Sequence, residues 1–302
     1  MGRFRSPESQ ASFAVRTKLA IGKPSHTKKG GDGRIHSLGT ARTYSDSLIG
    51  VAAYIADHKL DPSGNGLSSL SSETALNYLE ARAHEVGQKQ LDKDRQAMQM
   101  LLGTKLTVVK SELDQVLESR AYTQQQIQTI TEAQSKKHAL ATIIAADGGL
   151  RAHELLTLLP VDERLPSSHR AWSSERFEGR SDVTRFTVKG KGGLVREIAI
   201  RKEHAEQLAK LRLSEPRVVT DRDIFYLQHF DVGGGHKWSD SFSKASKREL
   251  GWSSGGHGVR HTYAQSRMRA LQSLGFDYEQ SLGIVSQELG HFRESQAEVY
   301  LR

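Results

Sequence analysis

Apolar residues recur at helical spacing along the first part of the chain. After Gly39, Tyr44, Leu48, Val51 and Ile55 follow at i, i+4, i+7 and i+11, which is one face of an α-helix. A loop rich in Asp, Pro, Ser, Gly and Asn, residues 61–66, ends this helix. Three further helices are predicted from similar spacings: Leu76, Leu79, Ala83 and Val86; Leu91, Met98, Leu101 and Leu102; Val109, Leu113, Val116 and Leu117. The pattern therefore predicts a helical bundle over residues 39–122.

The helical pattern restarts near Tyr122, where we place a domain boundary. Thr123 has the side chain of a helix N-cap, and apolar residues at helical spacing follow it in two predicted helices. The apolar residues of these helices are Ile127 and Ile130, then Leu140, Ile143 and Ile144. The second domain, residues 123–302, is thus predicted to begin with helices.

Two runs of β-branched and aromatic residues, 183–188 and 194–200, are the only convincing strands. The connection from Lys189 to Gly193 predicts a hairpin with a lysine at its tip. Residues 224–226 are apolar but show no assignable pattern, and helical patterns return after them. The fold class predicted is mainly α with a small β-sheet, in which a helical bundle precedes a larger second domain.

Composition and charge narrow the classes of partner. The 302-residue chain has a net charge of +8, which favours a polyanion. Residues 1–38 hold eight Arg and Lys but two carboxylates, so we expect a flexible basic arm that follows phosphates, or a disordered solubilising tail. No apolar run could cross a bilayer and no secretory signal is present, so a cytoplasmic, nucleoid-associated protein without membrane contact is expected. Zero cysteines exclude disulfides, thiolate metal sites and a cysteine nucleophile.

Two segments of the second domain present grouped cations. In GGLRAHELLTLLP, Arg151 is predicted in the first turn of a helix whose leucines are buried. In GGHGVRHTYA, His257 and Arg260 share a helical face, with His261 beside them. Such a group suits an anionic oxygen pair, because Arg binds phosphate through a planar fork of N–H donors. Each segment by itself also fits the solvated edge of a helix.

The printed sequence ends with His291 and Tyr300 nine residues apart. On one continuous helix this spacing would be about 900° and would aim the two side chains at opposite faces. Ser295 and Glu298 form the pattern of a capping box, which predicts a new helix from about Gln296. Tyr300 is therefore expected on a separate short helix that can swing toward a target.

Taken together, four boxes resemble the signature of the tyrosine recombinase (phage integrase) family. They read Gly149-Leu150-Arg151 with Glu154-Leu155, His257-Gly258-Val259-Arg260-His261, Leu289-Gly290-His291, and Tyr300 nine residues beyond that histidine. The resemblance covers roughly residues 40–302. It implies that residues 39–122 are a helical, SAM-like core-binding domain and that residues 123–302 are the catalytic domain.

The resemblance implies a nucleophile and its charge partners. Tyr300 is expected to attack a DNA phosphodiester and form a 3′-phosphotyrosine bond, so no ATP, cofactor or metal ion is expected. Arg151 and Arg260 are expected to hold the non-bridging oxygens, and His257 to be the acid/base partner of the tyrosine. His291 is expected to bond a non-bridging oxygen or to position Tyr300.

The resemblance also implies a catalytic lysine that protonates the leaving 5′ oxygen. In the family this lysine lies in the turn of a β-hairpin, often in a Gly-Lys-Gly sequence, which favours Lys191. Lys189, two residues earlier on the same turn, is the alternative.

The implied function is site-specific recombination of double-stranded DNA by a homotetramer on two recombination sites. The basic arm favours the integrase of a mobile element, and an accessory DNA-bending or directionality factor is compatible with it. One alternative is a type IB topoisomerase-like enzyme that relaxes DNA as a monomer. A second is a catalytically inactive DNA-binding accessory protein, against which the full set of site residues argues.

Three departures from the family pattern are expected to matter. The interval from Arg151 to Lys191 is long, so the loop 162–182 is expected to contact DNA or a partner subunit. The interval from Arg260 to His291 is also long. The family usually continues past the tyrosine into a tail that packs on a neighbouring subunit, whereas Leu301 and Arg302 end the printed sequence. Residues 1–38 are a candidate for that exchange if the chain does not continue.

Two other motifs fit poorly. The residues 251–255 match the G-x-S-x-G elbow of hydrolases, but that elbow follows a strand and residues 242–250 are predicted to be helical. His257 and His261 have the spacing of a zinc-binding pair, but the Glu of H-E-x-x-H and any cysteine are missing from that segment.

Overall fold

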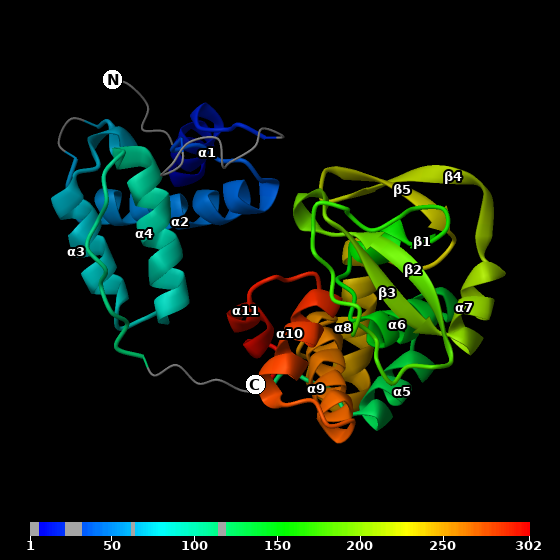
Figure 1. Cartoon of the computed structure of the whole chain (residues 1–302). Coiled ribbons are helices and arrows are strands. Elements are labelled where there is room, and N and C mark those ends of the chain that lie inside the picture. The colour runs from blue at the N-terminus through cyan, green and yellow to red at the C-terminus, as the bar shows by residue number, and fades with distance from the viewer. Residues whose placement is uncertain (1–5, 22–31, 62–63, 114–118) are drawn as a thin grey trace. The chain divides into compact units, whose positions relative to one another are not determined.

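The computed structural model describes residues 6–21, 32–61, 64–113 and 119–302, with the backbone but not the side chain of Lys191. The chain divides into two compact units, residues 1–116 and 117–302 (Figure 1). Within the described ranges, no helix is both long and apolar enough to cross a bilayer.

The first unit is a helical bundle. Its elements are α1 Pro7–Thr17, α2 Leu38–Asp57, η1 Gly66–Ser69, α3 Ser72–Arg82 and α4 Gln88–Leu102. The face predicted for α2 is buried, because Leu48, Val51 and Ile55 are each at most 2% exposed. They share one core with Leu79 of α3 and Met98 of α4, so three of the four predicted helices are confirmed.

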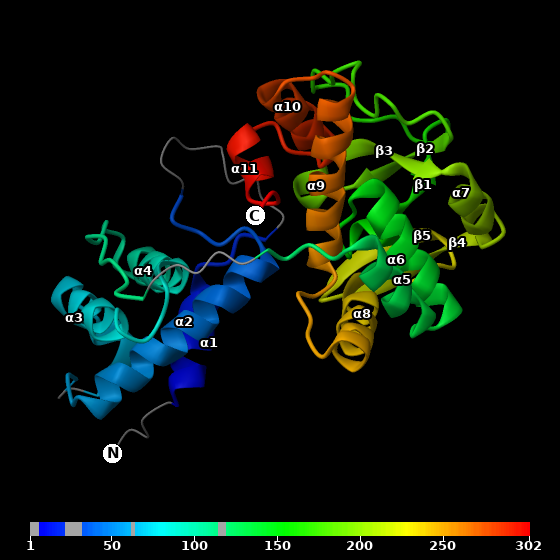
Figure 2. The same cartoon turned by 90° about the horizontal axis from the view of Figure 1, so that it is seen from below.

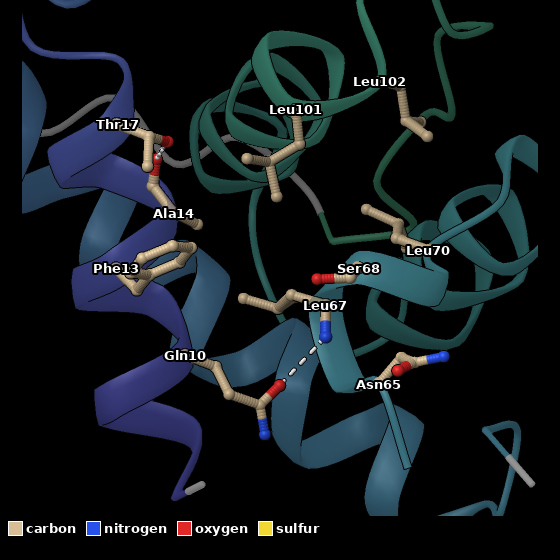
Figure 3. Close-up of a pocket in the computed structure, with 10 residues that line it drawn as sticks. All are labelled: Gln10, Phe13, Ala14, Thr17, Asn65, Leu67, Ser68, Leu70, Leu101 and Leu102. Carbon is tan, nitrogen blue, oxygen red and sulfur yellow. Dashed lines mark hydrogen bonds between the residues drawn. The ribbon is translucent and has the colours of Figure 1, made fainter. Parts of the chain in front are cut away.

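The expected basic arm is wrong for residues 7–17, which form α1 and pack on the bundle. Ser6 caps this helix, and Ala11 and Val15, one turn apart, are buried in the core of the unit. A cavity of about 310 Å³ lies between α1, η1 and the end of α4 (Figure 3). At its edge Gln10 accepts a hydrogen bond from the backbone N–H of Leu67 at 2.9 Å. The basic charge of the segment concealed this short apolar face. The parts of the arm at 1–5 and 22–31 lie outside the described residues.

The fourth predicted helix is not formed over residues 104–113. Gly103 ends α4 in the left-handed conformation at φ 72°, and its N–H is bonded to the carbonyl of Gln99. Val109 still packs against the core, but from an irregular segment. Left-handed glycine is a common helix stop, and it separates the apolar residues that follow from those of α4. Val116 and Leu117 lie outside the described residues.

The second unit is α-helical with two small sheets. Its elements are α5 Gln124–Glu132, α6 Lys136–Gly148, η2 Glu154–Thr157, β1 Leu159–Pro160, β2 Val183–Lys189, η3 Lys191–Gly193, β3 Val195–Arg201, α7 Lys202–Ala209, β4 Arg212–Asp221, β5 Ile224–Phe230, α8 Gly235–Leu250, α9 His257–Ser273, α10 Tyr278–Glu288 and α11 Glu294–Glu298. The predicted helix after Thr123 is confirmed, with a full capping box between Thr123 and Gln126. Tyr122 is 2% exposed in the core of this unit, so the division of the chain falls a few residues before the predicted boundary.

The predicted hairpin is confirmed, but the sheets are larger than expected. β2 and β3 pair antiparallel from Val183 opposite Arg201 to Lys189 opposite Val195, and β1 pairs with β2. A second sheet is the hairpin of β4 and β5, which includes the apolar residues 224–226. Its turn places Arg222 and Asp223 at positive φ without the glycine that usually marks such a turn, so the sequence carried no clear signal for it.

α9 is the central helix of the second unit (Figures 1 and 2). Val259, Ala264 and Leu271 of α9 are fully buried. Near its C-terminal half, α9 packs with α10 and with the short α11 in a separate apolar cluster that contains Tyr300. A buried helix that contacts both the main core and the end of the chain can bring distant segments together.

Candidate active site

Arg151 lies in a tight turn rather than in the first turn of an α-helix. α6 ends at Gly148, Gly149 adopts a left-handed conformation at φ 59°, and only a 3-10 turn, η2, follows. The side chain of Glu154 folds back on Arg151, accepting one bond from its backbone N–H and one from its guanidinium, both at 2.9 Å. The predicted helix is therefore wrong, but the turn fixes the direction of the arginine.

Glu154 is the fully buried centre of three arginines. It pairs with Arg151 at 2.9 Å and with Arg196 at 2.8 Å, and it lies 3.9 Å from Arg260. Burial alone would raise the pKa of Glu154, but the positive charges of Arg196, Arg260 and Arg151 hold it far below its ordinary value. One carboxylate thus fixes three guanidinium groups, with two positive charges left for an incoming anion.

Arg260 is fully buried within α9. Its two terminal nitrogens donate to the backbone carbonyls of Gly149 and Leu289, while its Nε has no partner in the described part of the chain. Burial, and next the nearby charge of Arg151, lower the pKa of Arg260 to about 10, so it stays charged at neutral pH. The backbone carbonyls set its position before any anion arrives.

His291 joins the two arginines to the tyrosine. It follows the end of α10, after Gly290 at φ 74°, where a Cβ would meet the side chain of Arg196 at 2.7 Å. Its Nε2 lies 3.0 Å from a nitrogen of Arg151, 3.3 Å from one of Arg260 and 3.5 Å from the hydroxyl of Tyr300. Since arginine can only donate, Nε2 is the acceptor and the proton of the neutral ring is on Nδ1.

Tyr300 lies just after a short terminal helix. The predicted break after His291 is present, but α11 begins at Glu294, and Ser295 does not cap it. Tyr300 follows α11 instead of lying on it, and it is 7% exposed. The guanidinium of Arg260 lies 5.1 Å from the centre of its ring, so the phenol is already within the group of cations.

His257 begins α9 and faces the same ring. Its ring centre is 5.5 Å from that of Tyr300, and its surface remains exposed to solvent. Loss of solvation beside the protein, and next the charge of Arg260, lower the pKa of His257 to about 4. The imidazole is therefore neutral at pH 7 and able to accept a proton.

The hairpin turn reaches the edge of the same site. Gly190 lines a cavity of about 280 Å³ together with Arg151, Glu154 and His291. Lys191 is the next residue, on η3, and its side chain lies outside the described part of the structure. Lys189 is exposed at the end of β2. Searching the described residues finds no group of three His, Cys, Asp or Glu that could hold a metal ion.

Comparisons with known proteins were made by sequence and by structure. No protein-family model matches the sequence, and no curated protein matches it. Among solved structures, XerH site-specific recombinase bound to a palindromic difH substrate aligns with a TM-score of 0.59 at 14% identity, over 100% of this chain and 94% of the other. The Tn1549 transposon integrase in complex with transposon right end DNA aligns with a TM-score of 0.55 at 12% identity, over 99% and 95%. The lambda integrase dimer bound to a COC′ core site aligns with a TM-score of 0.54 at 15% identity, over 88% and 89%.

The chain has the tyrosine recombinase fold. In the second unit of this recombinase fold, Arg151, His257, Arg260, His291 and Tyr300 meet although they are spread over 150 positions of the sequence. The sequence boxes that resemble the family thus come together around His291 and the ring of Tyr300.

Sequence reasoning missed two groups of this candidate site. Glu154 was part of a quoted box, but its contacts with three arginines could not be read from spacing. Arg196 lies two and four residues before Ile198 and Ile200, so all three side chains share the buried face of β3. This spacing of two was a signal in the sequence for a buried charge. A buried arginine needs a buried carboxylate, and Glu154 is that partner.

The long loop 162–182 packs beside the segment that carries His291. The backbone N–H groups of Ser173 and Phe177 donate to Gln287 and Glu288 at the end of α10, each at 2.7 Å. The ring of Trp172 lies 5.0 Å from that of Phe292, the residue after His291. The loop therefore supports the segment that carries His291 within its own unit.

Proposed function

We propose that this protein is a site-specific tyrosine recombinase that cuts and rejoins duplex DNA through Tyr300. The observation that carries the proposal is that Nε2 of His291 lies within 3.5 Å of Arg151, Arg260 and the hydroxyl of Tyr300. Two fixed guanidinium groups beside a phenol fit a phosphodiester under attack, because the added charge on its oxygens needs preorganised donors.

The cleavage step is balanced by the residues around the phenol. The hydroxyl oxygen of Tyr300 forms a bond to phosphorus, its proton passes to His257, and the bond from phosphorus to the 5′ oxygen breaks. The lowered pKa of His257 keeps it neutral and ready to accept that proton in the free protein. Lys191, or else Lys189, protonates the leaving oxygen. Resealing runs the same step in reverse, so neither ATP nor a metal ion enters the proposed reaction.

Partners follow from the same proposal. We propose that residues 39–122 bind the DNA beside the catalytic unit and that four copies act on two sites. A lambda integrase tetramer bound to a Holliday junction has this fold, with a TM-score of 0.54 at 15% identity. Two of the aligned proteins are integrases, and we propose that this chain likewise integrates or excises a mobile element.

Trapping with nicked DNA tests the chemistry. A pool of duplexes of randomised sequence, each nicked near its centre, loses a short fragment after cleavage and so prevents resealing. Wild-type protein is expected to form a covalent adduct in EDTA, visible on a denaturing gel. Tyr300→Phe should abolish the adduct, and Tyr278→Phe, the same change at an exposed tyrosine on α10, should not.

The outcomes separate the alternatives. An adduct that persists in Tyr300→Phe would remove this residue from its role. No wild-type adduct, either with the pool or with the DNA flanking its own gene, would favour an inactive DNA-binding protein. Relaxation of a supercoiled plasmid that lacks the selected sequence would favour the topoisomerase-like alternative.

A further inference from the structure

One face of α9 contacts the segment that carries the tyrosine. His257, His261 and Gln265 follow at intervals of four residues, so their side chains lie along the same face. The rings of His257 and His261 lie 5.5 and 5.0 Å from that of Tyr300. Gln265 donates through Nε2 to the backbone carbonyls of Tyr300 at 3.4 Å and Arg302 at 3.0 Å.

His261 is the buried member of this face. It is 4% exposed, and its ring packs against that of Tyr300, with the ring centres 5.0 Å apart. Its Nδ1 has no partner among the described residues. A buried imidazole packed against the phenol restrains the position of that ring, whereas His257 has an open surface for proton exchange.

The terminal segment has few other restraints. α11 is five residues long, without a side-chain cap, and Ala297 on it and Tyr300 after it are buried in the apolar cluster. A helix of this length is unstable without tertiary contacts. The contacts from α9 therefore decide how often the phenol lies in place.

We infer that His261, together with Gln265, is a positioning residue that holds Tyr300 in the active site. This inference rests on the proposed role of Tyr300 as nucleophile. His261 is not a catalytic residue here, because it acts by packing against the ring of the tyrosine.

Charge around His261 fits such a role. The titratable and charged groups that face it are His257, Tyr300, Arg120 and Arg260. Burial, then the charge of Arg120, lowers the pKa of His261 to about 4, although the backbone of Tyr300 acts in the opposite direction. The ring is neutral at pH 7, so it adds no repulsion to the arginines while it packs against Tyr300.

Hydrogen exchange of the full chain without DNA tests the inference directly. The amide of Tyr300 is bonded to the carbonyl of Ala297 at 2.9 Å, so its exchange reports whether the segment is in place. We expect peptides covering residues 296–302 to exchange about three- to tenfold faster in His261→Ala and Gln265→Ala, the range that one lost hydrogen bond gives. Gln272→Ala, an exposed glutamine on the same helix, is the matched control and should leave exchange unchanged.

His261→Gln gives a rescue test, because its side chain fills much of the space that the imidazole occupies beside Tyr300. This variant is expected to restore most of the protection that His261→Ala loses. Unchanged exchange at 296–302 in Gln265→Ala and His261→Ala would overturn the inference. If His261→Ala does not fold, Gln265→Ala alone decides, since Gln265 is only partly buried.

Cleavage kinetics give the second readout. On the nicked DNA selected by wild-type protein, His261→Ala and Gln265→Ala should slow adduct formation about three- to tenfold, with DNA affinity changed less than about twofold. A loss of affinity with an unchanged cleavage rate would contradict positioning. Exchange is measured without DNA, so a wild-type protein that forms no adduct defeats the proposed function while the exchange result still decides the placement.

Discussion

The arginines and the tyrosine of the proposed site are held in contrasting ways. Arg151, Arg196 and Arg260 surround the fully buried Glu154, and the last two also donate to backbone carbonyls of two separate segments, 148–149 and 288–289. Tyr300 follows a five-residue helix and depends on contacts from one face of α9. The difference teaches that the part that receives the phosphate is fixed, while the nucleophile is on a lightly restrained segment. Preorganised charge and a movable nucleophile are both compatible with a reaction that must also reverse.

Removing the buried carboxylate is the strongest test of the fixed part. Glu154→Ala leaves three guanidinium groups without their shared partner, so the second unit should lose about 3–5 kcal/mol of unfolding free energy. All three tryptophans, Trp172, Trp238 and Trp252, lie in this unit, so urea unfolding followed by tryptophan fluorescence reports on it. Asp240→Asn removes an exposed carboxylate paired with Lys244 and should leave the midpoint unchanged. Equal midpoints for both variants would contradict the buried network.

Removing one guanidinium tests the phosphate-binding part. Arg260→Ala should lower the rate of covalent adduct formation about 10²- to 10³-fold, as loss of one preorganised donor does. Arg260→Lys keeps the charge but not the planar fork of N–H donors, so its rate of adduct formation should lie between those of wild type and Arg260→Ala. Unfolding by urea must show that both variants are folded. A cleavage rate within twofold of wild type would remove Arg260 from the site.

Acid is expected to lower the unfolding free energy through the histidines that lie between the arginines and Tyr300. Burial, followed by Arg120 for His261 and by Arg260 for the others, lowers the pKa values of His257, His261 and His291 to about 4. The unfolded chain therefore binds more protons between about pH 6.5 and 4, so unfolding free energy is full above 6.5 and falls as pH falls through this window. Urea unfolding at several pH values checks the direction. A flat profile from pH 7 to 4 would contradict the lowered pKa values.

Bound DNA should raise the lowered pKa values of these histidines again. A bound phosphate favours the charged form of a nearby imidazole, so it raises the histidine pKa values and binding at pH 5 takes up protons. Calorimetry in two buffers of different ionisation enthalpy measures the number of protons. Binding without uptake at pH 5 would place the DNA phosphate away from these histidines.

The smallest expected change in unfolding free energy comes from removing a helix cap, and it can be compared at two predicted caps. Thr123 accepts a bond from the N–H of Gln126 at 3.1 Å, so Thr123→Ala should cost about 1 kcal/mol. Ser295 makes no cap on α11, so Ser295→Ala should leave stability unchanged. Urea unfolding of the two variants, followed by fluorescence, checks the pair. A cost for Ser295→Ala similar to that for Thr123→Ala would restore the predicted capping box.

Local patterns predicted those elements whose apolar residues form a long, regular stripe. α2, α5 and the β2–β3 hairpin follow the expected ranges closely. The predictions failed for elements that are short or whose local sequence also fits another structure. α1 was hidden by its basic charge, β4 and β5 by a turn without glycine, and the turn at Arg151 by leucines that also fit a helix. In each case tertiary contacts outweighed a weak local preference.

The sequence by itself determined the kinds of side chain, their order and the elements that carry them. Spacing put His257 and Arg260 on one helical face, and the chain had to break between His291 and Tyr300. Only the tertiary structure decided that Arg151 and His291, 140 positions apart, approach to 3.0 Å, and that Glu154 is the carboxylate that holds the arginines. The reason is physical: periodicity is a property of neighbouring residues, whereas a buried charge network depends on which segments the core brings together.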